Sequence, residues 1–134
     1  MRFIVFVCAL LAVLFWSASA FDMWATLTQW NRHHEMLGWA GAPAWRNAAW
    51  GASIAVGFAG AAALFWRARW AGDFMLTAVG FMTAGLAWDL VFGEGFRAYG
   101  QSGLASSAAI IAVAAMFTWA AYQFTKPPTV VQLA

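Results

Sequence analysis

The sequence predicts an all-α, polytopic membrane protein in which four transmembrane helices form one bundle. Three observations lead to this prediction. Of the 134 residues, 64% are hydrophobic and only 9% are charged, whereas a soluble domain has roughly 25% charged residues. The stretches 3–21, 47–66, 74–93 and 98–125 contain no charged residue except Asp89. Each stretch has about the 20 or more residues that a helix needs to cross a bilayer. Strands are disfavoured there, because lipid provides no hydrogen-bond partner for the open edge of a strand.

The chain reads as a single transmembrane domain that covers residues 1–134. The predicted spans are 3–21, 46–67, 72–92 and 104–125. Pro43 precedes the second span, Pro127 and Pro128 follow the fourth, and no proline lies within a span. This placement fits helices, because proline is tolerated at a helix start and disrupts a helix interior. Short connections between the later spans predict antiparallel neighbours.

The first span allows two interpretations. Arg2 precedes an apolar run that ends in the small residues Ser17-Ala18-Ser19-Ala20. This order is typical of a cleaved secretory signal, and it is equally compatible with a retained first helix. Removal of this span would leave the other three unchanged.

Residues 22–45 form the segment between the first two spans, and they are too polar to cross the membrane. Apolar and aromatic residues recur there at steps of one, three or four: Met23, Trp24, Leu27, Trp30, His34 and Leu37. That spacing marks one face of a helix. We expect an interfacial amphipathic helix, or a continuation of the first span that bends over the mouth of the bundle.

The charges predict the orientation. Arg67-Ala68-Arg69 is a short basic loop, and Arg2 and Lys126 fall on the same side as this loop. Because basic loops stay in the cytoplasm, both termini are expected there, with the chain in the inner membrane. The outer side then receives most of the carboxylates, namely Asp22, Glu35, Asp89 and Glu94. Most of the 10 tryptophans fall near the span ends, where indole rings anchor helices at the headgroup level.

The residues that could bind a cofactor lie on the predicted outer side. His33, His34, Trp30 and Asp89 are candidate contacts for a quinone, a haem or a chlorophyll, and His33, His34 and Met36 are candidate ligands for copper. Adjacent helical residues point about 100° apart, so both histidines cannot reach one metal from a regular helix. Polar residues that wet the outer surface are the simpler interpretation. No residue is assigned a catalytic role.

Asp89 is the ionisable residue that falls inside a predicted span. A charge at that depth costs a few kcal/mol and should face the bundle or water. Arg46 opens the second span on the same side of the membrane. We therefore expect a structural Arg46–Asp89 ion pair between helices. A role in ligand handling and simple extension to the surface are the alternatives.

Small residues repeat at about one helical turn in the later spans. The patterns are Ser53-x-x-x-Gly57, Gly80-x-x-x-Ala84 and Gly103-x-x-x-Ser107. Such faces let helix backbones approach closely, which favours contact within the bundle or with a neighbouring subunit.

Three functional hypotheses follow from this composition. A net charge of +2 without a basic stripe excludes a nucleic-acid binder. The favoured hypothesis is a non-catalytic accessory or assembly subunit of a larger inner-membrane complex, for which an energy-transducing complex is one candidate, with lipid and other membrane subunits as partners. The second is a protein that binds a quinone, tetrapyrrole or copper at its outer mouth. The third and least favoured is a small membrane enzyme that acts on a lipid or another hydrophobic substrate, using Asp89 or Glu94 with His34 as acid–base groups.

Overall fold

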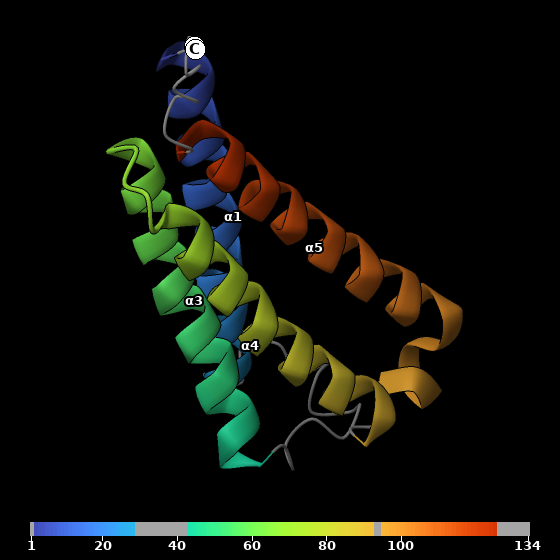
Figure 1. The fold of residues 1–134 in the computed structure, drawn as a ribbon. Helices are drawn as coiled ribbons and strands as arrows, with labels where there is room; N and C mark the ends of the chain where they lie inside the picture. Colours follow the sequence, from blue (N-terminus) through green and yellow to red (C-terminus); the bar gives the residue numbers. More distant parts are fainter. Residues whose placement is uncertain (1, 29–42, 93–94, 126–134) are drawn as a thin grey trace, which may run out of the picture.

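A computed structural model describes residues 2–28, 43–92 and 95–125. Four helices follow one another in this part of the chain (Figure 1): α1 (Arg2–Leu27), α3 (Ala44–Phe65), α4 (Ala71–Val91) and α5 (Gly95–Thr125). Every one of them contains a stretch that is long and apolar enough to cross a membrane, and the described residues include no strand. The predicted all-α, multi-pass fold is confirmed.

Two helices extend beyond the predicted spans. α1 continues to Leu27, past residue 21, and α5 begins at Gly95, ahead of its apolar stretch Gly103–Thr125, which agrees with the predicted span 104–125. The apolar stretches mark where lipid ends, whereas backbone hydrogen bonding continues into the polar turns on either side. Residues 22–27 therefore extend the first span. The rest of the predicted interfacial helix lies mostly outside the described residues, which omit 29–42.

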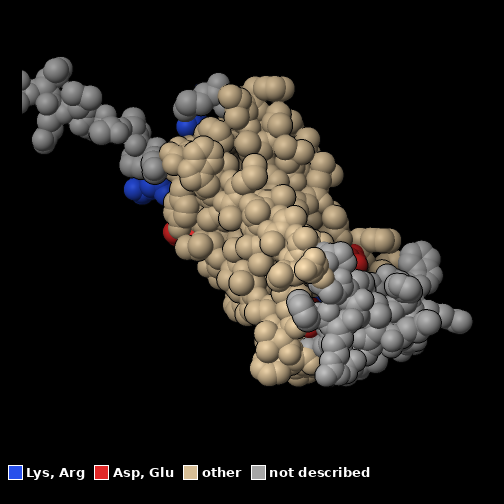
Figure 2. Space-filling model, turned by 90° about the vertical axis from the view of Figure 1, so that its right-hand side faces the viewer, with Lys and Arg blue, Asp and Glu red and all other residues tan. Residues whose placement is uncertain are grey.

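The helices pack in the order α1, α3, α4, α5, with the most extensive contact between α3 and α4. α1 and α5 lie close together near the ends of the chain, and α5 then leans away along its length (Figure 1). We call the end of the bundle with Arg2 and residues 66–70 the basic end. We call the opposite end, with Arg46 and Asp89, the ion-pair end. In Figure 2 the coloured charged side chains lie near these two ends, with an uncharged band between them.

Small residues of α3 make close helix contact possible. Trp16 of α1 is 1% exposed, and its ring lies directly on Gly57. A Cβ atom at Gly57 would fall 2.2 Å from the Cε2 atom of Trp16. The Trp16 indole N–H is buried without a hydrogen-bond partner in the described part of the chain. Shape, rather than hydrogen bonding, therefore determines the position of this ring in the core.

The small-residue pattern Gly80-x-x-x-Ala84 lies on the outer face of α4 and does not contact another described helix. Gly80 and Ala84 are exposed on α4, and no side chain or neighbouring helix of the described structure comes within 4 Å of a Cβ built at Gly80. Of the two roles that the sequence left open for Gly80-x-x-x-Ala84, contact inside the described bundle is therefore wrong. This face looks outward.

The basic end is fixed by a tight turn and one interhelical hydrogen bond. Arg67 follows α3 with φ 57°, and the Ala68 N–H donates to the Ala63 carbonyl at 2.8 Å, which closes α3 with a left-handed capping turn. The Tyr122 hydroxyl of α5 donates to Asp73 Oδ1 of α4 at 2.7 Å. The turn thus closes α3 ahead of α4, and the Tyr122–Asp73 hydrogen bond joins α4 to α5 at the basic end.

Candidate functional site

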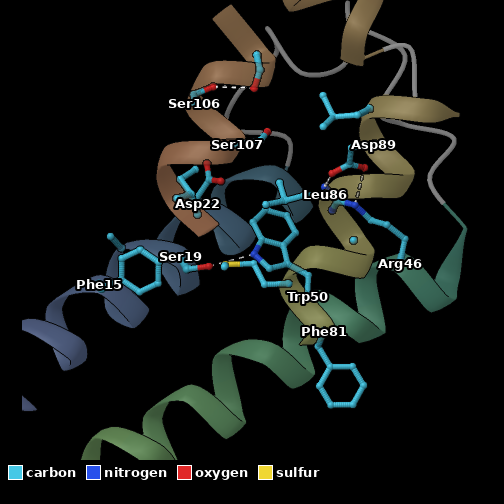
Figure 3. A pocket seen from close by; sticks show the side chains of 16 residues that line it. Phe15, Ser19, Asp22, Arg46, Trp50, Phe81, Leu86, Asp89, Ser106 and Ser107 are labelled. Carbon is cyan, nitrogen blue, oxygen red and sulfur yellow. Dashed lines mark hydrogen bonds and ion pairs between the residues drawn. The ribbon is translucent and has the colours of Figure 1, made fainter. Parts of the chain in front are cut away.

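A cavity of about 400 Å³ lies between the four described helices at the ion-pair end (Figure 3). Its lining comes from α1 (Phe15, Ala18, Ser19, Asp22), α3 (Arg46, Trp50), α4 (Phe81, Met82, Gly85, Leu86, Asp89, Leu90) and α5 (Gly103, Ser106, Ser107, Ile110). Pockets for small molecules usually measure about 300–1,000 Å³ and combine apolar walls with a few polar groups. In both size and lining, this cavity resembles such a pocket.

The cavity exists because α5 diverges from α1 and because the residues that face it include small ones. Gly85 illustrates the second point. It is buried, yet a Cβ added there would meet no neighbouring atom within 4 Å. Gly85 is therefore shielded from the exterior of the bundle, and the space next to its Cα atom belongs to the cavity.

A buried ion pair forms one wall. Arg46 and Asp89 are 4% and 6% exposed. Arg46 Nε donates to Asp89 Oδ1 at 2.8 Å, and Nη2 donates to Oδ2. The guanidinium also lies 4.6 Å from the ring centroid of Trp50, and Nη1 donates to Asn47 Oδ1 at 3.2 Å. A bidentate pair of this kind satisfies both charges, as a low-dielectric site requires.

Serine hydroxyl groups and the Asp22 carboxylate add further polar atoms to the wall. Trp50 Nε1 of α3 donates to Ser19 Oγ of α1 at 3.1 Å. Ser106 Oγ donates to the Gly103 carbonyl at 3.1 Å within α5. Ser107, also on α5, forms no hydrogen bond with the described residues. Two helices, α1 and α5, thus each contribute serine residues to the cavity lining.

The structure joins the two residues that the sequence expected to pair, Arg46 and Asp89, and places both in the cavity wall. The other candidates, His33, His34, Trp30 and Met36, lie outside the described residues, so the cofactor and copper assignments that involve them stay predictions. Within the described ranges no group of three His, Cys, Asp or Glu residues could hold a metal ion.

Sequence reasoning missed the roles of Trp50, Ser19 and Ser107. In the sequence, Trp50 is one of the tryptophans near the span ends, where indole rings anchor helices. Ser19 belongs to the signal-like segment, and Ser107 belongs to a small-residue helix face. The available signal was the presence of hydroxyl residues near one end of two separate spans. The sequence alone does not show that these ends face each other.

Comparison of the chain with protein-family models, curated proteins and solved structures finds no match. The geometry of the cavity is therefore the observation that bears on function.

Proposed function

We propose that this membrane protein binds a small amphipathic molecule in the cavity at the ion-pair end. The observation that supports the proposal is a cavity of about 400 Å³ with largely apolar walls and a few polar groups. A membrane-soluble ligand with an apolar body and a polar head matches that lining. A quinone, one of the cofactors predicted from the sequence, has this character.

The packing order supports entry from the side. Neighbours α1 and α3, α3 and α4, and α4 and α5 are closely packed, whereas α1 and α5 touch little. The divergence of α5 from α1 leaves this side as the route by which a lipid-dissolved molecule reaches the cavity. The proposal requires a retained α1, because Phe15, Ala18, Ser19 and Asp22 form part of the wall.

A pair of glycine substitutions on α4 tests the proposal. Gly85→Leu projects a side chain into the cavity, and Gly80→Leu projects the same side chain outward from the same helix. We expect Gly85→Leu to weaken the binding of a radiolabelled, uncharged short-chain quinone by at least about tenfold. The measurement is equilibrium binding to the protein in nanodiscs, corrected for empty nanodiscs. Gly80→Leu should bind like the wild type, and equal binding by both variants would refute the proposal.

The remaining sequence-based hypotheses have unequal support. An enzyme that uses Asp89 as a free acid or base is disfavoured, because both carboxylate oxygens accept hydrogen bonds from Arg46.

Placement in the inner membrane with cytoplasmic termini remains part of the proposal. It is supported by Arg2 at the start of α1 and by Arg67 and Arg69 between α3 and α4, segments that pack together at the basic end, since such residues favour the cytoplasm. This orientation would put the cavity in the outer half of the membrane.

An accessory subunit is the second candidate, and the outward face of α4 favours it. The small residues Gly80, Thr83, Ala84 and Ala87 are all exposed there. Small residues permit close packing between transmembrane helices, and van der Waals contact is the main force that joins helices in lipid. A helix of another subunit could pack on this face.

The same two glycine variants separate the second candidate from the first. If α4 packs on another subunit, Gly80→Leu should shift the complex to a smaller mass in native gel electrophoresis of digitonin-solubilised membranes, because the leucine prevents close approach. Gly85→Leu, which faces the cavity, should leave the mass unchanged. Migration of the wild type as a single chain of 14.5 kDa plus micelle would exclude the accessory role.

A further inference from the structure

The polar atoms that line the cavity limit the kind of headgroup that it can hold. Arg46 is already engaged within the protein, because Nε and Nη2 donate to Asp89, Nη1 donates to Asn47, and the ring of Trp50 covers one face of the guanidinium. The charges of Arg46 and Asp89 cancel. An anionic headgroup would therefore lose its hydration without gaining a cation from this pair, at a cost that buried charges rarely recover.

A cationic headgroup has no better partner in the wall. Asp89 is neutralised by Arg46. The described lining has one other carboxylate, Asp22, which lies exposed on α1 and already takes part in an interaction within the protein. Of the aromatic rings in the wall, Trp50 is the strongest partner for a cation, and it already has the Arg46 guanidinium over it. The remaining rings, Phe15 and Phe81, attract a cation less strongly.

The serine hydroxyls favour a neutral headgroup instead. Ser19 Oγ accepts the Trp50 indole hydrogen, and this hydroxyl donates to no acceptor in the described part of the chain. Ser107 Oγ has neither a donor nor an acceptor partner among the described residues. Figure 3 shows Ser19 on α1 and Ser107 on α5, both at the cavity. Each can donate a hydrogen bond to a ligand oxygen.

We infer that the cavity selects an uncharged amphipathic molecule whose carbonyl or hydroxyl oxygen accepts hydrogen bonds from Ser19 and Ser107. The apolar body of that molecule contacts Phe15, Met82, Leu86 and Ile110. This inference rests on the proposed function and specifies its ligand class. Long-chain ketones, alcohols and quinones belong to the class, whereas fatty acids and lipophilic amines do not.

A series of ligands with one alkyl chain tests the headgroup rule. The probes are 2-dodecanone, 1-dodecanol, dodecyl sulfate and dodecyltrimethylammonium, each used to displace the labelled short-chain quinone from the protein in nanodiscs. We expect the two neutral compounds to displace the quinone at concentrations at least about tenfold lower than the two charged ones. Displacement by either charged compound as effectively as by 2-dodecanone overturns the inference, while sensitivity to Gly85→Leu would still uphold the binding function.

A serine substitution tests the assigned contacts. Ser107→Ala removes a hydroxyl that bonds to no described residue, so the fold should be preserved. Its affinity for 2-dodecanone should fall about threefold to tenfold, the effect of one lost hydrogen bond. Displacement by dodecane, which has no oxygen, should not change. Ser17→Ala is the matched control, because Ser17 is exposed on α1 and does not line the cavity. Equal affinity of the Ser107 and Ser17 variants for 2-dodecanone overturns the inference. If Gly85→Leu leaves the affinity for the quinone unchanged, the inference and the proposed function are both overturned.

Discussion

Replacement of Asp89 by leucine is expected to destabilise the folded protein by about 3–5 kcal/mol, the largest effect of any single substitution considered. The carboxylate holds Arg46, which is 4% exposed, through both Nε and Nη2. Without Asp89 the guanidinium would be left buried and uncompensated at the end of a transmembrane helix. The free energy of unfolding in mixed micelles, measured by titration with a denaturing detergent, checks this expectation.

The double variant Arg46→Leu/Asp89→Leu provides the decisive comparison. When both charges are replaced by apolar groups of similar size, no buried charge remains, so most of the lost stability should return. We therefore expect the double variant to be more stable than Asp89→Leu alone, with a strong non-additive coupling between the two positions. Independent, additive losses at the two sites would show that Arg46 and Asp89 do not stabilise each other in the folded protein.

Gly57→Ala is expected to destabilise the protein by about 1–3 kcal/mol or more, although alanine is the better helix former. The added methyl group would lie 2.2 Å from Trp16 Cε2, so α1 and α3 would have to move apart. Helix propensity alone predicts the opposite sign, a gain of about 0.5–1 kcal/mol. Gly80→Ala, at an open and exposed position of α4, should show that gain. Thermal unfolding of the two variants in the same detergent distinguishes packing from propensity.

A second-site change identifies Trp16 as the cause. Trp16→Leu alone removes a large buried ring and should cost about 2–5 kcal/mol. In the Gly57→Ala background the same change also removes the clash, so the combined loss should be smaller than the sum of the single losses. Additive losses would mean that Trp16 and Gly57 do not press on each other in the folded protein.

The sequence predicts the number and order of the helices because charged residues are expensive in lipid and therefore mark the ends of each apolar stretch. Pairing of Arg46 with Asp89 could be anticipated for the same reason, since a charge within a span needs a partner and Arg46 lies at the same level. The helix ends could not be placed, because α1 and α5 continue through polar turns that lipid does not constrain.

The cavity could not be predicted from the sequence, because it depends on how helices rotate and lean. Ser53-x-x-x-Gly57 and Gly80-x-x-x-Ala84 are the same pattern, yet Gly57 is packed against Trp16 and Gly80 is open to the surroundings. The rotation of each helix is set by contacts between residues far apart in the chain. In the same way, Ser19 and Ser107 look like unrelated residues of two spans until the divergence of α5 brings them to one cavity.

The divergence of α5 also has a mechanical consequence. The described helices spread over a larger area at the ion-pair end than at the basic end, where α1 and α5 approach each other (Figure 1). In a bilayer they would therefore displace more lipid from one leaflet than from the other. Any movement that brought α5 against α1 would reduce the cavity and the area of the bundle in that leaflet together. Lateral tension, which favours larger area, would thus favour the open cavity, and membrane curvature would act on it through the same change in shape.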